Sequence, residues 1–280
     1  MRFFFLLFLA FNFSTFTKSQ IDSLNRSDWF PSGLNIQPFT ANFLEPKAGF
    51  SYILGKSELK LDIGTSADIF LHKWGNRFFS FGADLFTYTR LRGENDFRFP
   101  VETIDYLFGV NAGCKKVIND KEQFGFRFRL SHISAHLVDG SFDTQNKIWR
   151  ENKEPKTYSR EFVELFPYYS FDGLRIYLGV TYLVHSNPAF VGKWIYQSGF
   201  DYYAKGLINN FIIPFVAYDF RLTKVNKYSG NNIFETGIKF GEHNSKGVRV
   251  IFSYYSGKSI HGEYFDINEE YTTLGLNVDL

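Results

Sequence analysis

Alternating apolar and polar positions dominate the chain from residue 48 onward. Leu59, Leu61 and Ile63, for example, alternate with Lys60 and Asp62. A period of two residues is that of a β-strand whose two faces meet different surroundings. The pattern recurs in about twelve segments: 48–55, 58–72, 76–90, 99–113, 122–136, 157–170, 174–185, 192–204, 209–222, 231–241, 246–256 and 266–280.

The length and composition of these segments indicate a membrane barrel. Many are longer than the roughly five to six residues usual in soluble strands, and they suit the about 9–11 residues that cross a bilayer at a tilt. Their polar face carries Gly, Ser, Asp, Arg and Tyr, which is typical of a crowded polar lumen. We therefore predict an all-β fold, an antiparallel transmembrane β-barrel of about twelve strands over residues 48–280. A soluble secreted sandwich is the alternative.

The connections between these segments alternate in length, as they do in outer-membrane barrels. If the first strand starts in the periplasm, the longer connections face the cell exterior, and only the short one near Lys56 does not fit. The expected outer connections are 91–98, 137–156, 186–191, 223–230 and 257–265, and the expected periplasmic ones are 73–75, 114–121, 171–173, 205–208 and 242–245.

The first nineteen residues are typical of a secretory signal peptide. Arg2 precedes an uncharged, Phe-rich run over residues 3–16, and the small polar residues Thr17 and Ser19 occupy positions −3 and −1 of a cleavage after Ser19. Residues 20–47 follow without a clean period and contain three prolines. We expect them to form a short N-terminal periplasmic segment outside the main fold.

The last strand ends in a pattern that resembles the signal read by the outer-membrane barrel assembly machinery. Gly275 is followed by apolar residues at alternate positions, including Val278 and Leu280. That signal usually ends in Phe, so Leu280 is a departure from it. The resemblance implies this machinery as a partner during biogenesis.

Composition removes several other classes of function. Thirty-one basic and 29 acidic residues give a net charge of +2, so nothing suggests a nucleic-acid partner. Cys114 is the one cysteine, which rules out a disulfide framework and a cysteine-rich zinc site. A mean hydropathy of −0.20 is too polar for a bundle of membrane helices. We find no metal, nucleotide or phosphate motif and predict no cofactor.

Residues 122–136 carry the one constellation with possible chemistry. His132 and Ser134 share a strand face with Leu130, so they point outward to lipid, where polar side chains are costly. On the next strand Glu161 shares the outward face with Val163. We predict Ser134 as nucleophile, hydrogen-bonded to His132 as base, with Glu161 orienting the imidazole. The alternatives are contacts with lipid headgroups, or a bend that turns these residues inward.

The opposite strand face carries charges of both signs. Arg127, Arg129, Glu164 and Arg175 are expected to point into the lumen. Balanced charges of this kind can cross-link and fill a narrow barrel. A conductive lining is the alternative, which makes a narrow channel a further possible function.

Four motifs resemble a family of exported bacterial outer-membrane proteins described only as a domain of unknown function. They lie at residues 43–46 (Phe-Leu-Glu-Pro), 104–109 (Ile-Asp-Tyr-x-Phe-Gly), 132–139 (His-x-Ser-x-His-Leu-x-Asp) and 158–161 (Tyr-Ser-Arg-Glu). The similarity runs from about Phe39 to the C-terminus. It implies an exported barrel but no established activity.

The His-x-Ser pair also resembles that of outer-membrane phospholipase A and of the lipid A deacylase barrel. The resemblance implies that His132 and Ser134 match the lipid-facing pair of those enzymes, with an Asn or Glu as third member. The phospholipase continues with Asn-Gly where this chain has Ala135 and His136, which is a departure. Three functions therefore stand: an outer-membrane barrel of unspecified activity that contacts membrane lipid, a serine-type lipid acyl hydrolase, and a narrow channel.

Overall fold

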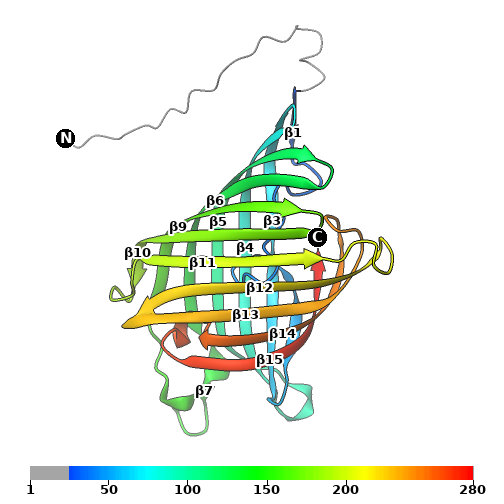
Figure 1. The fold of residues 1–280 in the computed structure, drawn as a ribbon. Coiled ribbons are helices and arrows are strands. Elements are labelled where there is room, and N and C mark those ends of the chain that lie inside the picture. The colour runs from blue at the N-terminus through cyan, green and yellow to red at the C-terminus, as the bar shows by residue number, and fades with distance from the viewer. Residues whose placement is uncertain (1–24, 280) are drawn as a thin grey trace, which may run out of the picture.

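The computed structural model describes residues 25–279, and its main feature is a barrel of twelve antiparallel strands (Figure 1). The barrel strands are β2 (Ala48–Ile53), β3 (Glu58–Trp74), β4 (Arg77–Arg92), β5 (Val101–Asn119), β6 (Glu122–Leu137), β9 (Tyr158–Phe171), β10 (Leu174–Asn187), β11 (Trp194–Tyr203), β12 (Ile212–Val225), β13 (Lys227–Phe240), β14 (Gly247–Lys258) and β15 (Asn268–Asp279). The predicted barrel is confirmed, and the soluble sandwich is wrong.

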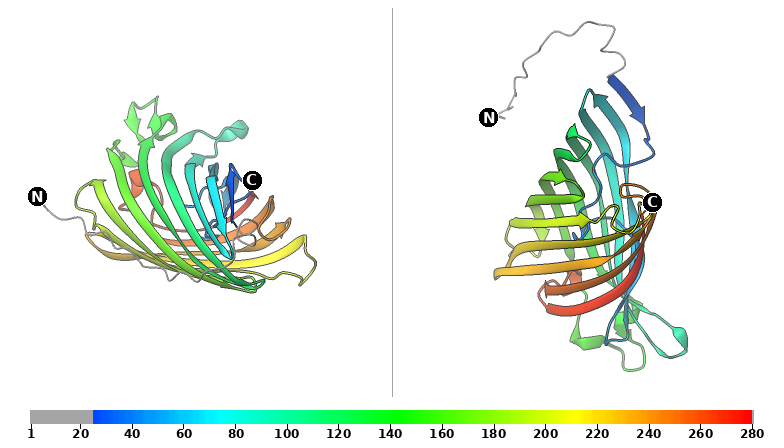
Figure 2. Two further views of the ribbon diagram at one scale, coloured as in Figure 1. Left: turned by 90° about the horizontal axis from the view of Figure 1, so that it is seen from above. Right: turned by 45° about the vertical axis from the view of Figure 1, so that its right-hand side comes forward.

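The barrel closes because the last strand pairs with the first. β15 pairs with β2, from Thr273 opposite Ile53 to Val278 opposite Ala48. β2 pairs in turn with β3. The strands tilt strongly, so those of the front wall in Figure 1 cross those of the rear wall. Figure 2 shows the tilted, curved wall from two further sides.

The two faces of the wall differ as the alternation predicts. Large apolar side chains cover the outside. Examples from ten of the twelve barrel strands, each 37–64% exposed, are Phe50, Ile63, Leu85, Phe108, Phe126, Leu165, Leu178, Phe234, Val250 and Leu276. A continuous exposed apolar surface of this kind is typical of a wall that faces lipid.

One further strand lies outside the barrel. β1 (Asn25–Trp29) pairs antiparallel with the end of β3, where Trp29 is opposite Phe70. β2 is shorter than β3 and leaves this end of β3 without a partner on that side. β1 therefore covers a strand edge that would otherwise expose unpaired backbone groups.

The connections distinguish two ends of the barrel. We call the end with the shorter turns the turn end; its connections are 75–76, 120–121, 172–173, 204–211 and 241–246. The other end, which we call the loop end, carries 54–57, 93–100, 138–157, 188–193, 226 and 259–267. A small hairpin of β7 (Phe142–Asp143) and β8 (Ile148–Trp149) projects there (Figure 1).

The predicted long connection 223–230 is wrong. β12 and β13 run on through it and are joined by Asn226 alone, which adopts a left-handed φ of 60°. Asparagine tolerates that conformation better than most residues do. The polar run around it therefore extends both strands instead of forming a loop.

Helical structure within residues 25–279 is limited to short 3-10 turns. They are η1 (Asn95–Phe97), η2 (Asp139–Ser141), η3 (Arg150–Asn152) and η4 (Gly262–Tyr264). No helix in this part of the chain has the length and apolar character needed to cross a membrane.

The segment before the barrel does not lie outside the main fold, as the sequence suggested, but fills the lumen. Residues 35–45, which we call the inner plug, include the fully buried Phe39 and Leu44. The Phe39 ring lies 4.3 Å from the ring of Tyr177 and 4.8 Å below the Arg127 guanidinium. The inward-pointing cations and aromatic rings of the strands bind the inner plug. The alternation of apolar and polar residues within the plug itself gives no indication of these contacts.

Ion pairs join the plug to the wall. Glu45 accepts two hydrogen bonds from the Arg127 guanidinium. Arg129 donates to Glu164 at 2.6 and 2.8 Å and to the Leu44 carbonyl at 3.1 Å. The side chains of Arg129 and Glu164 are each 1% exposed. The charges thus cross-link and fill the lumen.

The connection from β14 to β15 closes the loop end. Residues 259–267, which we call the cap loop, bury His261, Glu263 and Tyr264. Asp105, which is fully buried, lies 2.8 Å from His261 Nδ1 and accepts a 2.7 Å hydrogen bond from the Gly262 backbone. With the plug on one side and the cap loop on the other, the lumen offers no support for a channel.

Candidate active site on the outer wall

The centre of the candidate site is a histidine–glutamate pair on the outer wall. His132 of β6 and Glu161 of β9 are direct cross-strand partners. His132 Nδ1 lies 2.6 Å from Glu161 Oε1. Their side chains are 28% and 39% exposed, so both face outward. Strand parity predicted this direction, and the alternative in which a bend turns His132 inward is wrong.

Ser134 lies two residues further on the same face, with Ser159 of β9 opposite. Within residues 25–279 the Ser134 hydroxyl forms no hydrogen bond, so the expected Ser134–His132 contact is absent. Successive outward residues of a strand are about 7 Å apart at Cα. Ser134 thus shares the outward face of His132 without contacting its imidazole.

A second histidine belongs to the site and was missed at the sequence level. His185 Nδ1 lies 2.6 Å from Glu161 Oε2, so the carboxylate is held from both sides. His185 lies near the end of β10. A shift in the pairing register between Leu183 and His185 is a bulge, which turns His185 to the outside. The alternation of apolar and polar residues does not reveal a bulge, so nothing in the sequence indicated that His185 faces outward.

The carboxylate defines the donors in this cluster. An ionised Glu161 can only accept hydrogen bonds, so both imidazoles donate their Nδ1–H groups to it. Ser159 donates a third hydrogen bond, at 3.2 Å. The Nε2 atom of neutral His132 is therefore the one that can accept a proton.

The histidine–glutamate cluster has an aromatic ring beside it on β5 and polar side chains toward the loop end. The Phe108 ring, directly opposite His132, lies 4.9 Å from the imidazole. Tyr106 lies opposite Ser134, and its ring is 6.0 Å from that of the exposed His136. The cluster thus lies where the apolar wall gives way to polar side chains. In the described part of the chain no group of three or more His, Cys, Asp and Glu side chains could hold a metal ion.

The structure also places the other residues that the sequence singled out. Arg127, Arg129, Glu164 and Arg175 lie inside the barrel with ion-pair partners. Gly275 is crowded, since a Cβ there would lie 2.5 Å from the Phe50 carbonyl across the closing seam. Val278 is 44% exposed on the outside. Leu280 and the predicted signal peptide lie outside the described residues.

The fold defines this chain as an outer-membrane-type β-barrel protein. It is similar to the outer-membrane phospholipase A of Escherichia coli, with a TM-score of 0.53, 13% identity, and 87% of this chain and 93% of that chain covered. An active-site mutant of that phospholipase gives a TM-score of 0.52 over the same coverage, also at 13% identity. The translocator domain of the Neisseria meningitidis autotransporter NalP gives 0.34 at 10% identity, over 86% and 91%. At these identities the likeness shows the fold alone.

The sequence comparison identifies the family. The model of the family described as "Protein of unknown function (DUF1207)" matches residues 106–279, and the chain belongs to this family. No curated protein matches the sequence.

Proposed function

We propose that this protein is a lipid acyl hydrolase that works on the outer face of its barrel wall. The observation that carries the proposal is the 2.6 Å contact between His132 and Glu161, at the border where the apolar outer wall meets the polar side chains of the loop end. Lipid offers such a pair no partner, so placing it there without a function would be costly. Ser134 on the same face supplies the nucleophile.

The substrate class is an acyl ester of a membrane lipid. The acyl chains would lie along the exposed Phe126, Phe128 and Leu130 of β6, which continue directly from His132 toward the turn end. The ester linkage would then lie beside the polar cluster near the loop end. Phospholipid and the acyl esters of lipid A share this chemistry.

In the proposed reaction His132 acts as general base and then as general acid. Its Nε2 takes the proton of Ser134 as Oγ attacks the ester carbonyl. The tetrahedral intermediate collapses, the alkoxy oxygen leaves with the proton from Nε2, and an acyl-serine remains. Water then attacks the acyl group, its proton passes through His132 to Ser134, and the fatty acid departs.

Glu161 and His185 have supporting roles in this scheme. Glu161 fixes the tautomer of His132 and stabilises the imidazolium that forms during each proton transfer. His185 donates to the other carboxylate oxygen and so limits the rotation of Glu161. His185 is thus a positioning residue.

The test measures release of fatty acid from phospholipid and from lipid A by the purified protein in mixed detergent micelles. Ser134→Ala should reduce hydrolysis at least about a thousandfold. A fluorophosphonate probe should label the wild-type protein but not this variant. The matched control is Thr65→Ala, which removes another outward hydroxyl, on β3, and should keep full activity.

Two outcomes contradict the proposal. One is a wild-type protein that hydrolyses neither lipid. The other is a Ser134→Ala protein, folded by gel mobility, that retains wild-type hydrolysis. Either outcome leaves an outer-membrane barrel of unspecified activity as the better description.

The cellular setting belongs to the same proposal. We infer that the barrel resides in the bacterial outer membrane, with the loop end outward, and contacts outer-membrane lipid through its apolar wall. The similar barrels from bacterial outer membranes support this setting, as does the expected signal peptide. The barrel assembly machinery is then the expected partner during insertion, with Gly275, Val278 and Leu280 in its recognition signal.

A further inference from the structure

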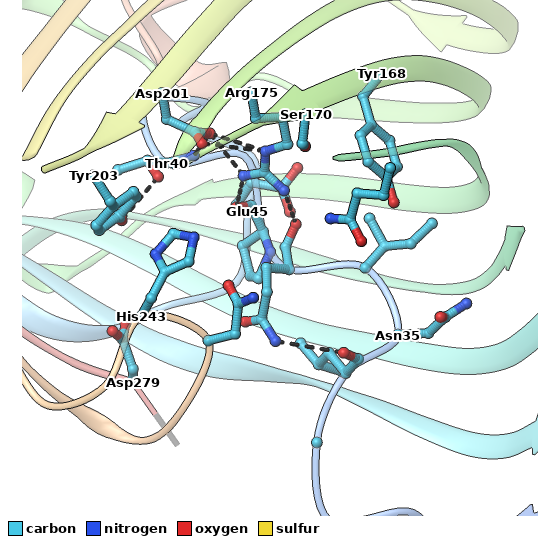
Figure 3. Close-up of a pocket in the computed structure, with 18 of the residues that line it drawn as sticks. Asn35, Thr40, Glu45, Tyr168, Ser170, Arg175, Asp201, Tyr203, His243 and Asp279 are labelled. Carbon is cyan, nitrogen blue, oxygen red and sulfur yellow. Dashed lines mark hydrogen bonds and ion pairs between the residues drawn. The ribbon is translucent and has the colours of Figure 1, made fainter. Parts of the chain in front are cut away.

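A cavity of about 380 Å³ lies at the turn end of the barrel, on the side opposite the proposed active site. Its walls come from the inner plug and from the ends of several strands, with Arg175, Tyr203, His243 and Asp279 around it (Figure 3). Its volume suits a small molecule. Nothing in the proposed hydrolase reaction uses it.

The charges around this cavity do not balance. Seven cationic and five carboxylate side chains line it: Lys47, Lys115, Lys121, Arg175, Lys205, Lys239 and Arg249, against Glu45, Asp120, Glu122, Asp201 and Asp279. Glu45 is neutralised by Arg127, which is not part of the lining. Lys121 is likewise neutralised by Asp172, which is not part of the lining either. Six cations therefore face four available carboxylates, an excess of two positive charges.

Four of the cations that line the cavity are only partly neutralised or not neutralised at all. Lys239 and Arg249 share a single carboxylate, Asp279, at 2.6 and 2.8 Å. Lys47 and Lys205 form no ion pair with any described residue. Cations gathered in a concave site with low-dielectric walls create a positive potential that attracts anions.

His243 lies within this region and has an unused hydrogen-bonding atom. Its ring is 4.7 Å from that of Tyr203, and its buried Nδ1 has no partner. The pKa of His243 is lowered to about 4, chiefly because the imidazole is buried. The positive charges of Lys205, Arg175 and Lys239 act in the same direction. The imidazole is therefore neutral at pH 7 and can donate one N–H bond.

We infer that this cavity binds a small oxyanion, a phosphate or carboxylate group, between His243 and the ammonium groups of Lys205 and Lys239. An oxyanion offset by these cations would balance the excess charge and accept the hydrogen bond that His243 leaves unused. Arg175 is held by Asp201 and by the carbonyls of Gln37 and Pro38. It contributes charge without changing partners.

The experiment follows the imidazole directly. The full-length barrel, labelled with ¹⁵N-histidine in detergent micelles, is titrated with inorganic phosphate and, separately, with acetate. His243 is assigned by comparison with His243→Gln. We expect saturable shifts of the His243 resonances and a rise in its pKa when the anion is bound, because a nearby negative charge favours the imidazolium. The anion that binds with the higher affinity, phosphate or acetate, identifies the group that the site prefers.

Matched variants separate a built site from general charge effects. Lys205→Gln removes a cavity cation and should weaken binding about two- to fivefold. Lys227→Gln removes an exposed lysine at the other end of the barrel and should leave binding unchanged. Equal effects of the two variants would contradict the inference. So would the absence of any saturable His243 shift with either anion. Neither result depends on whether the barrel hydrolyses lipid.

Discussion

The salt bridge between Arg129 and Glu164 offers the sharpest test of how the filled lumen stabilises this barrel. Glu164 receives two hydrogen bonds from Arg129 and one, at 3.0 Å, from Thr181. Arg129 also reaches the Leu44 carbonyl of the inner plug and lies 3.8 Å from Asp84. The substitution Arg129→Met keeps much of the side-chain volume but removes the cation.

The expected loss follows from what the substitution leaves behind. Glu164 would remain fully buried with only the Thr181 hydroxyl as a donor, and the Leu44 carbonyl would lose its partner. Removing one member of a buried ion pair costs about 3–5 kcal/mol, most of it from the charge left without compensation. We therefore expect Arg129→Met to lower the free energy of unfolding by about this amount. Adding Glu164→Gln removes the stranded charge and should restore part of the loss.

The assay is equilibrium unfolding in urea in micelles, followed by tryptophan fluorescence and by the heat-modifiable shift on gels. The control is Arg26→Met, because the Arg26–Asp28 pair on β1 is exposed and should contribute less than about 1 kcal/mol. A loss below about 1 kcal/mol for Arg129→Met would refute the reasoning. So would a double variant less stable than the single one.

Four further predictions concern the site, the seam and the location. Glu161→Gln should lower kcat for lipid hydrolysis about a hundredfold or more with little change in KM, because a neutral amide cannot stabilise the imidazolium. His185→Gln should lower kcat less and should shift the acid limb of the pH profile, whereas an unchanged profile would leave His185 without a role. A truncation lacking residues 266–280 should fail to insert and be degraded, because β2 and β14 would lose their shared partner; stable insertion of this truncation would contradict the assembly signal. Cell fractionation should recover the protein in the outer membrane in a heat-modifiable form, and recovery from the soluble periplasm would count against this location.

The barrel could be predicted because its physical cause is local. A wall with lipid on one side and a polar interior on the other requires side chains to alternate along every strand. The outward direction of His132 and Glu161 followed from the same parity, and so did the inward direction of Arg129. Each of these assignments needs only the residue's own strand and the identity of its neighbours two positions away.

The contents of the lumen could not be predicted in this way. The inner plug has no period, because its residues are held by single contacts with different strands rather than by a common face. Phe39 lies among Arg127, Arg175 and Tyr177, which are far from it in the sequence. Only closure of the barrel brings these partners together.

The candidate site on the outer wall was also predictable only in part. The sequence by itself determined that His132, Ser134 and Glu161 point outward, since one period of two residues governs them all. Tertiary structure decided the cross-strand register that sets Glu161 opposite His132 and the bulge that brings His185 to its other side. Register and bulges depend on hydrogen bonds between strands, and the alternation within one strand carries no information about those bonds.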